Sequence, residues 1–404
     1  MKKKNISSIN NFSINLKKNS HSNLSKKFEK IFLEISNDVK TKKKTLNILD
    51  KKFKLNFKIK DLKKFKNYKT ITLIGMGGSI LGTEAIYNFF QKKIKKKFYF
   101  FNNLDENKLY DFKKKENLSK VLFIIISKSG NTIETLSNLF SLNIIKKNSK
   151  NIIIISEKKN NLLFSLSKEF NLYYVEHRNY VGGRYSVLSE VGILPSYLMG
   201  INIFKIRSKI SEIFKTTNKK LLKNNTLKIV NLINSKKFNN IIFLNYCPEL
   251  EKFLYWNQQL LAESLGKKNK GLLPMVSNAP KDHHSLLQLY LDGPKDNLFY
   301  IFSLEESLNK KINIKTGTKF KTFLDQKKIS TIKDAQKNAL IKTLTKKNIP
   351  FREFRIKKIN EETIGKLFSL FIIETIVVGK LLNVNPFDQP AVEQVKIYTK
   401  ELLN

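Results

Sequence analysis

The stretch ITLIGMGGSILGTEAIYNFF, residues 71–90, decides the expected fold. It opens on a short strand-like run, passes through the glycine-rich turn Gly75–Ser79, and continues with apolar side chains at helical spacing. Such a turn can hold an anion, because its exposed N–H groups and the positive end of the helix dipole point the same way. The turn is not a complete G-x-G-x-x-G fingerprint, since Ile80 replaces the third glycine, and tight packing is an alternative use of the glycines.

A second stretch, VLFIIISKSGNTIETLSNLF at residues 121–140, repeats the order of strand, polar turn and helix. Its turn carries three hydroxyl side chains, Ser127, Ser129 and Thr132, each able to donate to a phosphate oxygen. Helix capping by serine and threonine is the alternative role. Because ligands of doubly wound sheets bind at the carboxyl ends of the strands, two such turns in neighbouring units favour a phosphate site.

Strand-like runs alternate with helical segments through the first half of the chain. The runs lie at residues 71–74, 98–101, 121–126, 152–155 and 172–175. This alternation predicts a doubly wound parallel α/β domain, buried on both faces. A lysine-rich stretch at 205–223 leads to further strands at 241–244 and 298–302, so a second α/β domain is expected.

The expected boundaries are an N-terminal extension and helical segment at 1–44, α/β domains at 45–204 and 205–383, and a C-terminal amphipathic helix at 384–404. Residues 1–25 are rich in Lys, Asn and Ser, so we expect a loosely packed extension there. The segment NPFDQP, which precedes the C-terminal helix, is expected to be a loop.

The net charge of +43 raises the question of a nucleic-acid or membrane partner. The cationic excess is lysine along the whole chain, and only five residues are arginine, the side chain that reads bases and clamps phosphates. A solvated lysine-rich surface is therefore expected, with neither nucleic acid nor membrane as partner. Its positive field would attract anionic substrates, and the on-rate would fall as salt rises.

Two further features predict a cytoplasmic protein. The single cysteine, Cys247, excludes an intrachain disulfide framework, and the N-terminal residues lack the apolar core of a signal peptide. The apolar segment 367–382 contains Glu374 and Lys380, so it is not expected to span a membrane.

Three other segments carry side chains suited to acid-base chemistry. Arg184 follows a glycine pair and precedes a helix expected to start near Ser186, where it could meet an oxyanion or form a surface salt bridge. Glu263 lies near the end of a helix, as a candidate general base or a solvated side chain. His283 and His284 offer an imidazole for proton transfer, and their spacing disfavours zinc, so neither metal nor cofactor is expected.

Six motifs in order resemble the glucose-6-phosphate isomerase family, as a compact bacterial-type member, over about residues 71–396. They are IGMGGSILG, SKSGNTIET, VGGRYSVLSEVGILP, QQLLAESLGK, KDHHSLLQ and NPFDQPAVEQVK. The resemblance implies two sugar isomerase domains with a C-terminal helix, a homodimer with active sites near the interface, and interconversion of glucose 6-phosphate and fructose 6-phosphate in glycolysis and gluconeogenesis.

The resemblance also implies roles for individual residues. Glu263 corresponds to the base, His284 to the ring-opening residue from the neighbouring subunit, Lys396 to the lysine at the ring oxygen, and Arg184 to the group that stabilises the enediolate. The phosphate and substrate positions correspond to Gly78, Ser79, Ser127, Lys128, Ser129, Thr132, Glu134 and Gln389.

Ala391 departs from the family pattern, which has glycine after proline in the last motif. If that position required positive φ, alanine would strain the loop that sets Lys396. Two other readings stay open at this stage: a different sugar phosphate isomerase of the same fold, and a non-catalytic regulator that binds sugar phosphates.

Overall fold

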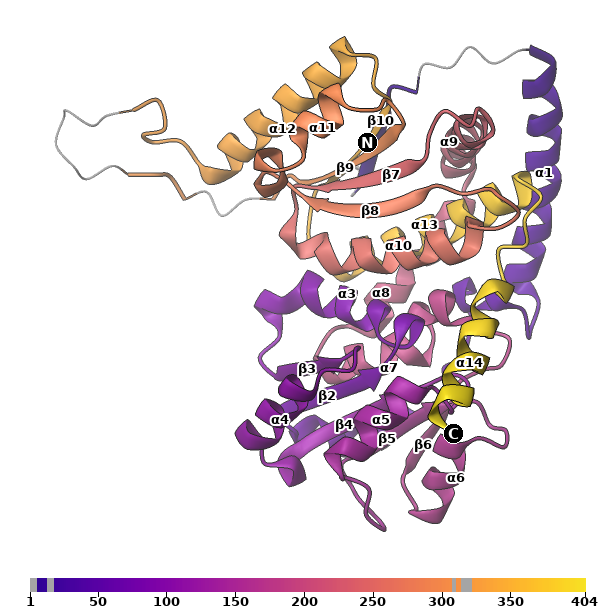
Figure 1. The fold of residues 1–404 in the computed structure, drawn as a ribbon, viewed down its shortest axis with the longest axis vertical. Helices are drawn as coiled ribbons and strands as arrows, with labels where there is room; N and C mark the ends of the chain where they lie inside the picture. Colours follow the sequence, from indigo (N-terminus) through magenta and orange to yellow (C-terminus); the bar gives the residue numbers. More distant parts are fainter. Residues whose placement is uncertain (1–5, 13–17, 307–309, 314–321) are drawn as a thin grey trace.

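The computed structural model describes residues 6–12, 18–306, 310–313 and 322–404, which contain two five-stranded sheets (Figure 1). The strands are β1 (Ile6–Asn10), β2 (Thr70–Gly75), β3 (Lys97–Phe101), β4 (Val121–Ile126), β5 (Ile152–Ser156), β6 (Tyr173–Glu176), β7 (Asn240–Asn245), β8 (Leu273–Asn278), β9 (Asn297–Leu304) and β10 (Phe351–Ile356). The α-helices are α1 (Lys18–Lys40), α2 (Ile59–Leu62), α3 (Leu81–Phe90), α4 (Glu106–Lys115), α5 (Ile133–Leu142), α6 (Leu162–Glu169), α7 (Glu190–Leu198), α8 (Ile203–Ser208), α9 (Thr216–Asn234), α10 (Glu251–Leu265), α11 (Leu287–Asp292), α12 (Ile329–Lys346), α13 (Glu361–Leu381) and α14 (Glu393–Leu403).

The first sheet has the strand order β3-β2-β4-β5-β6, with all neighbours parallel. Every residue of β4 is buried, and its side chains alternate between two apolar clusters, with Ile124 in one and Phe123 and Ile125 in the other. Helices therefore cover both faces, which confirms the doubly wound architecture. The strand order reverses between β2 and β4, the place where such sheets bind ligands.

The second sheet has the order β1-β10-β9-β7-β8 and is parallel except for β1, which pairs antiparallel with β10. The expected strands at 241–244 and 298–302 are present within β7 and β9. Strands β8 and β10 were missed because their sequences, LPMVSN and FREFRI, contain proline or charged residues. In β10 the buried Arg352 is neutralised by Glu374, with N···O distances of 2.7 and 2.8 Å.

The N-terminal residues differ from the expectation of a loosely packed extension. Residues 6–10 form β1, and the Cα of Ser8 pairs with that of Phe354 in β10. An edge strand needs only one bonded neighbour and can keep polar side chains, so the polar sequence ISSIN suits this position.

Helices α3 and α10 pack against each other between the two sheets (Figure 1). Helix α13 packs against α10, includes most of the apolar segment 367–382 and is buried along nearly its whole length. Among the described helices, none combines the length and apolar character that crossing a membrane requires. The stacked helices bring the end of α10 close to the ligand-binding edge of the first sheet.

The segment NPFDQP is a loop up to Gln389, as expected, and leads through a short 3-10 helix, η11 (Pro390–Val392), into α14. The C-terminal helix is confirmed, but its apolar side chains are exposed, including Val395 (67%), Tyr398 (55%) and Leu402 (87%). The helix therefore leaves an apolar face uncovered within this chain.

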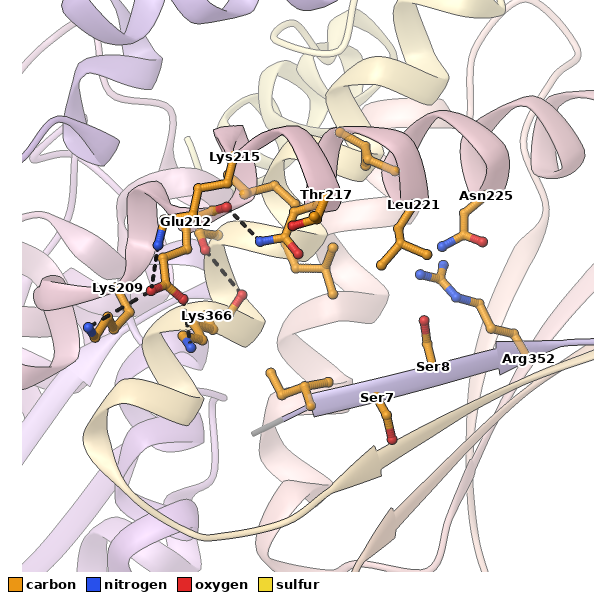
Figure 2. A pocket seen from close by; sticks show the side chains of 16 residues that line it. Ser7, Ser8, Lys209, Glu212, Lys215, Thr217, Leu221, Asn225, Arg352 and Lys366 are labelled. Carbon is orange, nitrogen blue, oxygen red and sulfur yellow. Dashed lines mark hydrogen bonds and ion pairs between the residues drawn. The ribbon is translucent and has the colours of Figure 1, made fainter. Parts of the chain in front are cut away.

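A cavity of about 410 Å³ lies beside the second sheet, between β1, α9 and α13 (Figure 2). At one end Glu212 pairs with Lys366 and Lys215, at 2.7 and 3.3 Å, and at the other end lies the buried Arg352. None of the site residues expected from the sequence lines this cavity.

Candidate active site

Close backbone contacts shape the first glycine-rich turn. Gly77 has a φ of +50°, a region that favours glycine. A Cβ on Gly78 would lie 2.2 Å from the carbonyl carbon of Gly183, so only glycine lets the two segments approach this closely. The turn, a 3-10 helix η3 (Gly77–Ser79), is thus pressed against the segment that carries Arg184.

The three hydroxyl groups of the second polar turn, between β4 and α5, lie close together. Ser127 Oγ lies 2.8 Å from Thr132 Oγ1, and Ser129 Oγ lies 3.5 and 3.4 Å from these two atoms. Thr132 occupies the N-cap of α5, but its side chain makes no capping bond. Gly130 has a φ of +71°, and a Cβ there would lie 1.7 Å from Asn161 Oδ1, so glycine is required. The three hydroxyls therefore form one polar group at the start of a helix.

Strand pairing brings the two turns together. Gly75, the last residue of β2, pairs with Ile126, the last residue of β4. A Cβ on Gly75 would lie 2.9 Å from the Ile126 carbonyl oxygen and 3.2 Å from Ser79 Cβ. Ser79 and the Ser127 turn therefore share the switch point of the first sheet.

Arg184 is not a surface residue, as the salt-bridge alternative supposed, because only 3% of it is exposed. Its guanidinium donates to side chains and carbonyls from two distant segments. The bonds run from Nε to Ser264 Oγ (2.9 Å), from Nη1 to Glu263 Oε2 (3.0 Å) and Gln389 Oε1 (2.6 Å), and from Nη2 to the carbonyl oxygens of Pro386 (2.7 Å) and Asp388 (3.0 Å). Arg184 therefore joins α10 to the loop before α14.

The expected helix start near Ser186 was wrong. Residues 183–188 form the 3-10 helix η6 (Gly183–Leu188), and α7 begins at Glu190. Ser186 Oγ donates back to the carbonyl of Gly183, whereas Ser189 caps α7 by accepting from the N–H of Val191. This tight turn holds Arg184 against α10.

Glu263 receives a second hydrogen bond, from Gln259 Nε2 to Oε1 at 2.8 Å. Sequence reasoning missed Gln259, although it lies four residues before Glu263 and therefore on the same helix face. Gln259 also contacts the first glycine turn, because a Cβ on Gly77 would lie 2.8 Å from its Nε2. Both carboxylate oxygens of Glu263 therefore accept a hydrogen bond. The side chain is still 28% exposed, so a ligand can reach it.

Lys128 follows Ser127 and approaches Glu157, with an N···O distance of 3.6 Å. Burial lowers the pKa of the Lys128 ammonium; the charge of Glu157 opposes this effect, and the charges of Lys159 and Arg184 add to it. Lys128 therefore adds a positive charge beside the hydroxyl-rich turn.

The structure places the remaining predicted site residues on three separate elements. Glu134 is in the first turn of α5, and His284 is an exposed residue of the 3-10 helix η9 (Lys281–His284). Lys396 lies on α14 and pairs with Glu393 at 2.7 Å. Neither His284 nor Lys396 shares a hydrogen bond with Glu263 in the described part of the chain, and Figure 1 shows α11, which follows η9, far from α14.

Ala391, the departure from the family pattern, lies within η11 and is not among the residues with positive φ. The alanine is therefore compatible with the conformation of this loop. Among the described residues, no group of three or more His, Cys, Asp or Glu side chains is assembled to hold a metal ion.

The contact of Gly78 with Gly183 predicts that Gly78→Ala disrupts the site. The added Cβ would force η3 and η6 apart and move Arg184. We expect a loss of thermal stability and of sugar-phosphate binding, measured by differential scanning fluorimetry and calorimetry. Gly183→Ala is the control, because its Cβ would lie 3.8 Å from Gly78 Cα; equal behaviour of the two variants would contradict the packing argument.

A buried imidazole predicts acid sensitivity. Burial lowers the pKa of His177 to about 4, with the charge of Lys128 adding to the effect and that of Glu157 opposing it. The unfolded chain, with a histidine pKa of about 6.5, binds the proton first, so this group removes stability as pH falls from about 6.5 to about 4. We expect the free energy of unfolding of His177→Gln to fall less steeply than that of the wild type as the pH is lowered through this range. Urea denaturation at several pH values measures the slope. An identical pH slope in the two proteins would refute this assignment.

Comparison with known proteins places this chain in a family. A family model described as phosphoglucose isomerase matches residues 18–277. A glucose-6-phosphate isomerase from Methanocaldococcus jannaschii is 35% identical over 349 residues, covering 83% of this chain and 84% of that protein. Another from Campylobacter jejuni is 30% identical and covers 89% and 90%. The crystal structure of a glucose-6-phosphate isomerase from Chlamydia trachomatis shares the fold, with a TM-score of 0.80 at 16% identity over 99% of this chain and 88% of that chain. The chain therefore belongs to the phosphoglucose isomerase family.

Proposed function

We propose that this protein interconverts glucose 6-phosphate and fructose 6-phosphate, a step of glycolysis and gluconeogenesis. The observation that carries the proposal is the carboxylate of Glu263, which Arg184 and Gln259 hold beside the first glycine-rich turn. Aldose-ketose isomerisation needs a base, a nearby cation and a phosphate site, and we assign these roles to Glu263, Arg184 and the two polar turns of the first sheet.

The substrate phosphate would bind at the switch point of the first sheet. Backbone N–H groups of the turn at Gly78 and hydroxyls of Ser79, Ser127, Ser129 and Thr132 are the donors we assign to it. Lys128 would supply a neighbouring cation, while Glu134 and Gln389 complete the pocket. The helix start of α5 adds a favourable dipole for the phosphate dianion.

The proton transfer would use Glu263 as the base. Its carboxylate takes the proton from C2 of the aldose and returns it to C1, which leaves an enediolate in between. Arg184 would stabilise the negative oxygen, because its guanidinium already lies 3.0 Å from the base and is shielded from water. Positioning these charges before the reaction avoids reorganisation during it.

Ring opening requires a further acid-base group, and we assign it to His284 of a second copy of the chain, with Lys396 acting at the ring oxygen. Two observations support a homodimer: α14 exposes an apolar face, and η9 with α11 lies far from α14 in one chain. The single buried Cys247 and the sugar phosphate substrates support a cytoplasmic location.

Replacing the base tests this function directly. We expect Glu263→Gln to lower conversion of fructose 6-phosphate to glucose 6-phosphate by roughly 10²- to 10⁴-fold, since the amide cannot accept the proton. The assay uses chelator-treated protein and a coupled dehydrogenase readout. Glu251→Gln, at the other end of α10, is the matched control and should keep the wild-type rate. A folded wild type without activity, or a fully active Glu263→Gln protein, would refute the proposal.

We expect the adjacent residues His283 and His284 to have different functions. His283 Nε2 lies 2.7 Å from the hydroxyl of Tyr246, so this ring is held within its own subunit, whereas His284 is exposed. We expect His284→Ala to lose turnover on the cyclic substrate and His283→Ala to keep most of it, compared by steady-state kinetics. The reverse pattern would assign ring opening to His283.

A further inference from the structure

Three neighbouring strands of the first sheet end in polar residues that lie side by side. Lys128 comes two residues after β4, Glu157 directly after β5, and His177 directly after β6. Backbone bonds tie these ends together: the N–H of Glu157 donates to the Lys128 carbonyl at 3.1 Å, and the N–H of His177 to the Ser156 carbonyl at 2.7 Å. The three side chains therefore share the edge that carries the hydroxyl-rich turn.

Glu157 is a buried carboxylate that lies next to two cations. Its side chain is 8% exposed, one oxygen lies 2.5 Å from Lys159 Nζ, and the other lies 3.6 Å from Lys128 Nζ. The latter separation is longer than a hydrogen bond, and an ammonium has three N–H donors. Glu157 thus attracts Lys128 by charge, and closing this gap would use only one of the three N–H donors.

His177 offers a second acceptor to the same ammonium. The ring is 2% exposed, and its Nδ1 lies 3.1 Å from the carbonyl oxygen of Arg178. Because a carbonyl can only accept, Nδ1 carries the proton of the neutral ring and Nε2 is the acceptor. Nε2 is buried and has no hydrogen-bond partner, an arrangement that costs free energy unless a donor pairs with it.

The strand ends place Lys128 on the same edge as the ring. The N–H of Glu157 donates to the Lys128 carbonyl, and β5 pairs with β6 up to Ser156 and Glu176, the residues just before Glu157 and His177. The positive charge of Lys128 also acts on the His177 ring. A carboxylate brings no proton to an acceptor, so the ammonium of Lys128 is the group that can satisfy Nε2.

We propose that Glu157 and His177 position Lys128, whose ammonium donates one N–H to each of them and presents the third to an oxygen of the bound sugar phosphate. This assignment rests on the proposed function and adds two residues that support its cation. Neither touches the substrate, so both act through Lys128. The fixed acceptors at the ends of β5 and β6 would determine where the third donor points.

Steady-state kinetics of His177 variants separate this role from a purely structural one. His177→Phe removes the acceptor, and we expect KM for fructose 6-phosphate to rise roughly tenfold with kcat near the wild-type value, because Lys128 binds the substrate equally before and during reaction. His177→Gln keeps an acceptor of similar reach and should restore most of the affinity. A lowered melting temperature with unchanged KM in His177→Phe would overturn the positioning role.

A double-mutant cycle provides the second readout. If His177 acts through Lys128, then His177→Phe should raise KM no further in a Lys128→Met background. Independent, multiplicative effects on KM would contradict the proposal.

Glu157→Gln tests the positioning role if the His177→Phe protein does not fold. Removing the carboxylate makes the edge more positive, so a purely electrostatic role predicts a lower KM, whereas loss of positioning predicts a higher one. The wild type serves as reference in the same assay. An inactive wild type that does not bind fructose 6-phosphate would overturn the function itself, whereas an active wild type with unaffected variants would overturn only the positioning role.

Discussion

The buried guanidinium of Arg184 connects parts of the chain that are far apart in sequence. It lies on η6, donates to Ser264 and Glu263 of α10, and reaches Gln389 and two carbonyls in the loop before α14. A cation with 3% exposure is tolerated because these acceptors replace its hydration. Truncating it would leave Glu263 without its charged partner and the loop without its anchor, so the geometry of Glu263 depends on this one side chain.

The position of Arg184 depends in turn on backbone that only glycine allows. Gly78 meets Gly183 at a distance that no Cβ permits, and this contact joins the first glycine-rich turn to η6. The two polar turns, Glu263 and Arg184 are therefore parts of one packed unit at the switch point of the first sheet. Such preorganisation fits a reaction whose main difficulty is stabilising charge on an enediolate.

The sequence predicted those parts of the molecule that local patterns determine. The strands of the first sheet and both polar turns follow from apolar runs and glycines, and Glu263 and Arg184 stood out by motif. Strand β10 could not be predicted from its own sequence, because its charged residues are neutralised by distant partners. One such partner is Glu374, which lies 22 residues from Arg352. Gln259, Glu157 and His177 were not predicted for a similar reason, since the roles proposed for them depend on neighbours on other strands and helices.

If Glu263 is the base, a proton and not a hydride moves between C2 and C1 of the sugar. The reaction can be run in D₂O and the sugar phosphates followed by NMR. A carboxylate base that holds the proton between the two carbons can exchange it with solvent, so we expect deuterium at C2 of glucose 6-phosphate and C1 of fructose 6-phosphate. Complete turnover with no solvent deuterium at either carbon would contradict it.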